Sequence, residues 1–194
     1  MAPANARAAP KVPHAPLSGP ATGGPVKPGG GLQATRTAKA AKSLREVYDD
    51  KCKEIHTSKP NSVILGMLPD KPSSTLSSDT LDLRRNYVGD KGLVPVLEVV
   101  QRSPQLRKLN FSENGLRNNS IKLMCAVLLK HPGVTSIDVS DNYISEGAGR
   151  ALEQLLKENP RITDLSFVNT KIDVDLRLRL KELLGQNMTA AANA

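Results

Sequence analysis

Aromatic residues are scarce in this sequence, which has no tryptophan, three tyrosines and two phenylalanines among 194 residues. Proteins that read single-stranded RNA stack its bases on aromatic side chains, so the shortage disfavours that role but leaves contacts to phosphates open. No apolar run reaches the roughly 18 residues that a membrane-spanning helix needs. Only two cysteines occur, Cys52 and Cys125, and neither lies in a CxxC pair, which is typical of a reduced, intracellular protein.

Catalytic and metal-binding motifs are also missing. The histidines, His14, His56 and His131, lack the spacing to Cys, Ser or acidic residues that a nucleophile or a metal site requires, so we expect them to be solvated or structural. The glycine-rich stretch GGPVKPGGG lacks the residue order of a phosphate-binding loop and is interpreted as a linker. Cys125 shares a repeat position with Leu97 and Glu153, which favours a packing role. We expect no enzymatic activity, metal or cofactor.

Acidic residues are absent from the first 45 residues, although the net charge of the whole chain is +8. Basic residues there account for almost all of this excess, so the charge belongs to an N-terminal arm and the remainder is close to neutral. An acidic protein lattice such as microtubules requires only charge and extension of its ligand, so we favour it over RNA. A membrane is disfavoured because no apolar residues accompany the charges. The basic residues are Arg7, Lys11, Lys27, Arg36, Lys39, Lys42 and Arg45.

Residues 1–33 hold seven of the fourteen prolines and six of the fourteen glycines. Such a composition cannot bury a core, so this segment is predicted to be an extended, basic arm. Its first residues, MAPANARAAPKV, have the composition of a mitochondrial presequence, but their prolines disfavour the amphipathic helix that presequences form. A cytoplasmic or cytoskeletal location is therefore preferred to a mitochondrial one.

Residues 34–77 are predicted to form an N-terminal cap. An apolar stripe with helical spacing predicts an amphipathic helix that ends before Ser58. The following stretch NSVILGML is interpreted as a strand, and PDKPSSTLSSD as a polar loop. The stripe consists of Leu44, Val47, Tyr48, Cys52 and Ile55.

A repeat of 28 residues organises the chain from residue 78 to residue 187. Every residue in its main columns is apolar in all four units, as in the set Leu81, Leu109, Ile137 and Leu165. Each unit contains a short strand with period 2, a turn, and a helix of about twelve residues with period 3.6. Parallel strands lie about 4.8 Å apart while helices need about 10 Å, so the array must curve, with strands inside and helices outside.

The motif LxxLxLxxN occurs as LRKLNFSEN (106–114) and VTSIDVSDN (134–142), with SDTLDLRRN (78–86) as a weaker copy. With the 28-residue unit, it resembles the ribonuclease-inhibitor-like class of leucine-rich repeats. The resemblance implies an α/β fold: a leucine-rich-repeat solenoid with a curved parallel sheet inside, helices outside, and an extended N-terminal tail. It covers about residues 78–187, which leaves 188–194 as a C-terminal tail.

One polar residue recurs in the apolar columns: Asn86, Asn114 and Asn142 are separated by 28 residues. In the repeat class that the sequence resembles, this asparagine is buried after the strand and its amide bonds to backbone groups of adjacent repeats. We expect a structural asparagine ladder here. The fourth unit has Thr170 at this position, so we interpret it as the capping end.

The outward strand positions predict a polar strip on the concave face of the sheet, where a protein partner could dock. A solvated face without a partner is the competing interpretation. Tyr87 and Tyr143 follow two of the repeat asparagines and are candidate aromatic anchors at the loop edge, although simple loop packing would also explain them. The polar strip comprises Thr80, Asp82, Arg84, Lys108, Asn110, Ser112, Ser136, Asp138, Ser140, Asp164, Ser166 and Val168, of which Asp82, Arg84, Lys108, Asn110, Asp138 and Asp164 are the main candidates.

The sequence thus predicts a non-catalytic scaffold subunit of a large intracellular assembly. Short repeat proteins of this kind occur in flagellar and cytoskeletal assemblies, so we expect a setting in the axoneme or on microtubules, with tubulin or microtubule-associated proteins as partners. Two alternatives remain open. One is a ribonucleoprotein component whose basic arm threads RNA, and the other is a GTPase-activating-type regulator, because Ran GTPase-activating proteins share this repeat class.

Overall fold

Short strands alternate with helices from Thr80 onward, as the periodicity predicts. The computed structural model describes residues 41–56 and 59–193. Within these residues, two helices precede the first strand, α1 (Leu44–Glu54) and α2 (Ser62–Met67). Strand and helix then alternate as β1 (Thr80–Asp82), α3 (Gly89–Gln101), β2 (Lys108–Asn110), α4 (Asn118–Leu128), β3 (Ser136–Asp138), α5 (Glu146–Glu158), β4 (Asp164–Ser166) and α6 (Val174–Ala192).

The four strands form one parallel sheet in the order β1-β2-β3-β4. Leu81 pairs with Leu109, Leu109 with Ile137, and Ile137 with Leu165, so the register follows the 28-residue spacing of the sequence. Adjacent parallel strands need a crossover connection, and each helix from α3 to α5 provides one. The α/β class and the parallel sheet are therefore confirmed.

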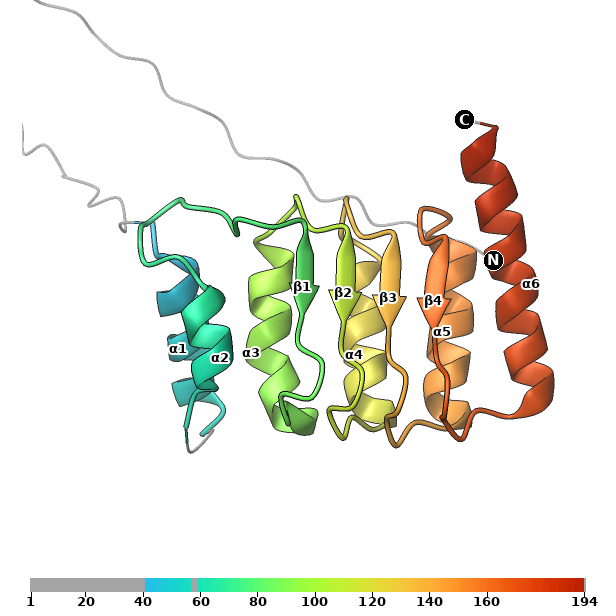
Figure 1. Cartoon of the computed structure of the whole chain (residues 1–194), viewed down its shortest axis with the longest axis horizontal. Helices are drawn as coiled ribbons and strands as arrows, with labels where there is room; N and C mark the ends of the chain where they lie inside the picture. Colours follow the sequence, from blue (N-terminus) through green and yellow to red (C-terminus); the bar gives the residue numbers. More distant parts are fainter. Residues whose placement is uncertain (1–40, 57–58, 194) are drawn as a thin grey trace, which may run out of the picture. The chain divides into compact units, whose positions relative to one another are not determined.

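The core lies between the sheet and the helices that follow its strands. In every strand the middle residue is buried while its two neighbours are partly or fully exposed. Helices α3, α4 and α5 lie on one face of the sheet (Figure 1). They contribute fully buried side chains such as Leu93, Met124 and Leu152. The opposite face, which carries the strand neighbours, is the open face.

Successive units cap one another's helices. Helix α4 has no side-chain cap of its own, but Asp90 at the start of α3 accepts the backbone N–H of Arg117 at 2.8 Å. Asn118 of α4 likewise accepts the N–H of Ser145 at 2.8 Å, directly before α5. The first N–H groups of a helix lack intrahelical acceptors, so each cap ties a unit to the one before it.

Helix α1 buries the stripe that the sequence predicts. Ser43 and Glu46 form a reciprocal capping box at its N-terminus, which explains why the helix begins at Leu44. Four residues of the stripe are buried, and Ile55 at its end is half-buried. The helix packs against α3.

The strand predicted for NSVILGML is wrong, because residues 62–67 form helix α2. Asn61 decides the outcome: its side-chain oxygen accepts the N–H groups of Val63 and Ile64 and thereby nucleates a helical turn. The apolar, β-branched composition had favoured a strand, but only Ile64 of this short helix is buried. As a consequence, β1 is an edge strand.

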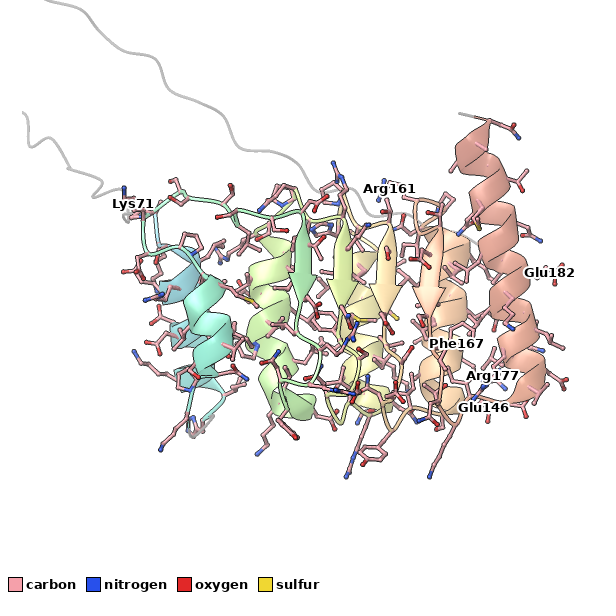
Figure 2. All side chains as sticks on the ribbon, in the orientation of Figure 1. Lys71, Glu146, Arg161, Phe167, Arg177 and Glu182 are labelled. Carbon is pink, nitrogen blue, oxygen red and sulfur yellow. The ribbon has the colours of Figure 1, made fainter. Side chains whose placement is uncertain are left out.

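Helix α6 continues to Ala192, so the predicted tail at 188–194 is helical over most of its length. Its last turns are rich in alanine, the strongest helix former, which the repeat pattern did not take into account. The helix packs on α5 through Leu176 and Leu180, and Figure 2 shows Glu182 farther along it. Within residues 41–56 and 59–193, no helix combines the length and apolarity that crossing a membrane requires.

Candidate protein-binding surface

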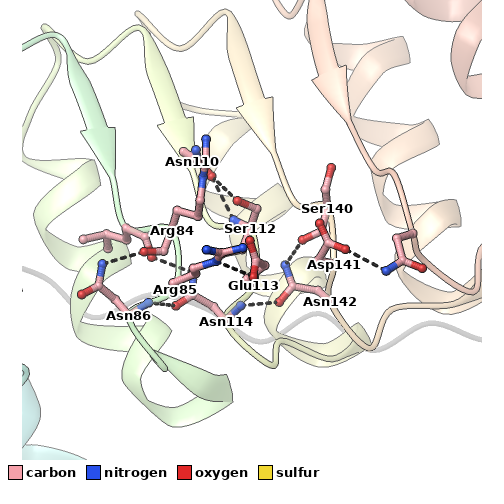
Figure 3. Close-up of polar contacts among 12 residues, drawn as sticks. Arg84, Arg85, Asn86, Asn110, Ser112, Glu113, Asn114, Ser140, Asp141 and Asn142 are labelled. Carbon is pink, nitrogen blue, oxygen red and sulfur yellow. Dashed lines mark hydrogen bonds and ion pairs between the residues drawn. The ribbon is translucent and has the colours of Figure 1, made fainter.

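The repeat asparagines Asn114 and Asn142 satisfy backbone groups of two units at once (Figure 3). The side-chain oxygen of Asn114 accepts the N–H groups of Asn86 (3.2 Å) and Val88 (3.1 Å). Its amide nitrogen donates to the carbonyl of Leu83 at 2.8 Å. Asn142 repeats this arrangement one unit later, and both side chains are buried. Buried backbone groups need such partners, which explains why asparagine occupies this position.

Asn86 departs from the predicted ladder. Its side chain is only half-buried, and its amide nitrogen donates to Arg84 of its own loop at 3.1 Å. The physical reason is that no strand precedes β1 within residues 41–56 and 59–79, so no carbonyl of the described chain takes the place that Leu83 has for Asn114. At the other end, the buried hydroxyl of Thr170 donates to the carbonyl of Phe167 at 2.8 Å.

A second buried polar column lies at the opposite edge of the sheet, where the strands begin. Asn159 donates to the carbonyl of Leu128 at 3.0 Å, and Asn187 donates to the carbonyl of Leu156 at 3.1 Å. Sequence reasoning missed this column because its residue types differ. The available signal was the spacing of 28 residues and, for the first three members, the proline that follows each. The column consists of Ser103, His131, Asn159 and Asn187.

His131 is therefore structural, with one tautomer fixed by its partners. Its Nδ1 accepts the backbone N–H groups of Gly133 (3.1 Å) and Val134 (3.2 Å), so Nδ1 carries no proton. Its Nε2 donates to the carbonyl of Ser103 at 3.2 Å. Burial lowers the pKa of His131, and the nearby cations Arg107 and Arg161 act in the same direction. Figure 2 shows Arg161 at this edge.

The main candidates for docking do lie on the open face. Asp82, Arg84, Lys108 and Asp164 are exposed, while Asn110 and Asp138 are half-buried. Two residues of the predicted polar strip, Ser112 and Ser140, are instead buried because the chain turns inward after each strand.

Three of these candidates also have a structural task. The side-chain oxygens of Asp82, Asn110 and Asp138 each accept the backbone N–H two residues later, at 3.0, 3.0 and 2.9 Å. This Asx-type bond shapes the turn that leads to the repeat asparagine. Asp164 accepts a hydrogen bond from Ser136 at 2.8 Å. Of the six candidates, Arg84 and Lys108 are used least by the fold and are the best probes of binding.

Tyr87 and Tyr143 lie at the loop edge with 91% and 70% of their surface exposed. Tyr87 also has a backbone φ of 50°, a left-handed conformation that is strained for a bulky residue. At the equivalent position of the next unit the chain has Gly115, with φ of 69°. Loop packing therefore does not explain Tyr87, which supports its choice as an anchor candidate.

Another column of left-handed residues lies beside these tyrosines. Arg85 pairs with Glu113 at 2.6 Å, and Asn169 donates to Asp141 at 2.7 Å (Figure 3). All four have φ between 53° and 58°. Both pairs are exposed, so they contribute little to stability but fix the loops at equal spacing.

The basic arm falls largely outside the described residues. Arg7, Lys11, Lys27, Arg36 and Lys39 belong to that segment, as does His14. The last two cations that the sequence assigned to the arm belong to the fold. Lys42 pairs with Asp50, and Arg45 pairs with Asp70 at 2.8 Å and donates to the carbonyl of Leu65.

Other reactive side chains are poorly placed for chemistry. Cys52 and Cys125 are free and buried, and burial raises the pKa of the Cys125 thiol to about 12. A thiol with so high a pKa is a weak nucleophile at neutral pH. His56 is exposed at the end of α1. In the described part of the chain, no three His, Cys, Asp or Glu side chains are grouped to hold a metal ion.

These features define a leucine-rich-repeat-like α/β fold. A solved structure described as "Leiomodin-1 Actin-Binding Site 2 (ABS2)" is similar to it, with a TM-score of 0.52 and 12% identity over 75% of this chain and 92% of that chain. A tropomodulin C-terminal domain from Caenorhabditis elegans gives a TM-score of 0.45 and 10% identity over 75% and 95% of the two chains. At this identity the first likeness concerns the fold alone. No protein-family model and no curated protein matches the sequence.

Proposed function

We propose that this chain is a non-catalytic, protein-binding subunit of a cytoskeletal assembly, built as a short leucine-rich-repeat solenoid of the ribonuclease-inhibitor-like type. The observation that carries the proposal is the open face. Its charged side chains are presented to solvent on a rigid parallel sheet, and the helices lie on the other side (Figure 1). A rigid surface of mixed charge that no described helix covers suits recognition of another protein.

The anchor candidates support this assignment. Tyr87 carries backbone strain without burying its ring, and such strain persists where a side chain serves function rather than packing. Exposed tyrosines contribute strongly to protein interfaces because a large amphipathic ring is ordered at little entropic cost. Tyr143 lies on the same loop edge. Both tyrosines directly follow a repeat asparagine, in the turns that come after the strands of the open face.

The cytoskeletal part of the proposal has two supports. The similar structure is titled as an actin-binding site, which makes an actin filament or an actin-associated protein one candidate partner. The basic, acid-free arm favours an acidic lattice, so microtubules in a flagellar axoneme are the other candidate. In either setting the folded part supplies specificity and the arm supplies salt-sensitive attraction.

Co-sedimentation of the full-length chain tests the proposal. Actin filaments and microtubules are pelleted with the protein in one buffer at increasing salt, beside a mobility-shift assay with structured RNA. We expect saturable binding to a filament, with tighter binding than to RNA. Deleting residues 1–33 should weaken the binding and reduce its salt dependence, because Arg7, Lys11 and Lys27 are lost.

Each outcome separates the candidates. Saturable co-sedimentation with only actin filaments or only microtubules identifies that filament as the partner. Tighter binding to RNA would replace the proposal with the ribonucleoprotein alternative. Binding to neither filament would remove the direct filament contact, and a specific protein within the assembly would then be sought by co-purification and mass spectrometry.

A further inference from the structure

Strand β1 is the edge of the sheet beside α2, and its outer side has unpaired backbone groups. The N–H of Leu83 donates to Asn110 of β2 at 2.9 Å, and the carbonyl of Asp79 accepts from Arg107 at 2.7 Å. Successive residues of a strand direct their N–H and C=O groups to opposite sides, so Thr80 and Asp82 direct theirs away from β2. Among the described residues, no hydrogen bond uses the carbonyl of Thr80 or the backbone N–H of Asp82.

A groove of about 510 Å³ runs along this edge, between α2 and β1. Its lining includes the apolar side chains of Met67, Leu76 and Leu81, with Met67 43% exposed. Gly66 of α2 also lines it, and outside its chain neighbours and its own helix backbone no atom lies within 4 Å of the position where a Cβ would be. The groove therefore has an apolar wall beside backbone groups that lack partners, which is the arrangement that an added strand requires.

The charges at this edge are acidic. Asp82 lines the groove, Asp79 lies between two lining residues, and both carboxylates are exposed. Neither forms an ion pair with any described residue, and none of the described residues that line the groove is Lys or Arg. Side chains of an added strand would alternate between the apolar wall and the open face where Asp82 lies. The complementary ligand is an extended peptide in which apolar and basic residues alternate.

We propose that the outer edge of β1 binds such a segment of a partner protein by strand addition. Main-chain hydrogen bonds to the carbonyl of Thr80 and to the N–H of Asp82 provide the pairing, since the N–H of Thr80 already donates to Ser78 at 3.0 Å. The apolar side chains of the segment pack on Met67 and Leu76, and its basic side chains lie near Asp79 and Asp82. This proposal does not depend on the partner being cytoskeletal. It shares Asp82 with the open face, but its main-chain pairing and its apolar wall use residues other than Tyr87, Tyr143, Arg84 and Lys108.

The test is fluorescence anisotropy of the full-length chain with the labelled synthetic peptide KVKVKVK, and with EVEVEVE as its acidic counterpart. We expect saturable binding of KVKVKVK that weakens with salt and in Gly66→Phe. EVEVEVE is attracted to the basic arm instead, so its affinity should be the same in Gly66→Phe as in the wild type. Two further peptides carry N-methyl groups on all valine or on all lysine nitrogens. In strand addition only one alternate set of amides faces β1, so only one of these peptides should lose binding.

Matched protein variants locate the site. Gly66→Phe fills the groove and should weaken KVKVKVK binding at least about tenfold. Gly185→Phe in α6 is its control, because Gly185 also has nothing within 4 Å of an added Cβ. Replacing Asp79 and Asp82 by Asn keeps the acceptor for the N–H of Arg84 but removes both charges, and should reduce the salt dependence.

Thermal unfolding of each variant establishes that it is folded. Equal effects of Gly66→Phe on the lysine and glutamate peptides, or equal effects of Gly66→Phe and Gly185→Phe on KVKVKVK, would overturn the proposal. Loss of binding with neither N-methylated peptide would also overturn it, because main-chain pairing would then play no part.

Discussion

The two buried polar columns perform the same task with different residues. At the edge where the strands end, Asn114 and Asn142 are identical and make the same set of bonds to the preceding unit. At the edge where the strands begin, serine, histidine and asparagine occupy equivalent positions. A repeat of residue identity can be seen in a sequence, whereas a repeat of hydrogen-bonding capacity is visible only once the carbonyls to be satisfied are known.

The largest effect is expected at the first column. Asn142→Ala removes the acceptor for the N–H groups of Asn114 and Leu116 and the donor for the carbonyl of Phe111. Since unsatisfied buried groups cost about 1–3 kcal/mol, chemical denaturation should show a loss of roughly 3 kcal/mol, and Asn114→Ala should behave similarly. Thr170→Ala is the control at the same column, with a much smaller loss. Equal losses for Thr170 and Asn142 would contradict the ladder.

The second column should be less sensitive. Asn187→Ala leaves the carbonyls of Leu156 and Ile162 without the amide that donates to both, at 3.1 and 3.0 Å. Carbonyl groups tolerate incomplete pairing better than N–H groups do, so we expect a loss of about 1–2 kcal/mol in the same denaturation assay. Gln186→Ala, at an exposed neighbour in α6, provides the control and should change little. A loss at Asn187 as large as that at Asn142 would make the two columns equivalent.

Only the second column can titrate near neutral pH. Burial lowers the pKa of His131 below its ordinary 6.5. At a pH just below 6.5 the imidazole therefore stays neutral in the folded state but has bound a proton in the unfolded state. The unfolded state then binds more protons, and stability should fall as the pH is lowered through 6.5. His131→Asn should remove this part of the pH dependence of denaturation, whereas His56→Asn should not. An unchanged pH profile in His131→Asn would exclude His131 as its source.

Tyr87 lies beside the first column, and the equivalent residue of the next unit is Gly115. Both have a left-handed backbone, which glycine adopts without strain and tyrosine does not. Tyr87→Gly should stabilise the fold by about 1 kcal/mol, since a left-handed backbone costs roughly that much for a side chain with a Cβ. The same variant should weaken partner binding if the ring is an anchor. Leu123→Ala on helix α4, with a side chain 41% exposed, is the control for losing an exposed apolar group. Destabilisation by Tyr87→Gly would mean that the ring packs after all.

Much of the fold could be predicted from the 28-residue columns. The buried residues recur with period 2 in the strands and every three or four residues in the helices, so the two kinds of element differ in the sequence. The helix α2 could not, since Asn61 caps it locally against the preference of a β-branched run. The partial exposure of Asn86 could not be predicted either, because it depends on the segment before β1, which lies outside the repeat. For the site, the placement of the six main candidates on the open face was predictable, whereas the burial of Ser112 and Ser140 was not. The bonds from Asp82 and Asp138 to their own turns, and the strain at Tyr87, were not.

The central claim is that the open face binds a protein while the buried polar columns only hold the units together. The most direct test compares Lys108→Glu on the open face with Lys122→Glu on helix α4, which is the same charge reversal at an exposed site on the other side. Both full-length variants are co-sedimented with actin filaments and microtubules, beside the wild type. The account predicts that Lys108→Glu weakens binding at least about tenfold while Lys122→Glu binds like the wild type. Equal binding of the two variants, or a larger loss for Lys122→Glu, would contradict it.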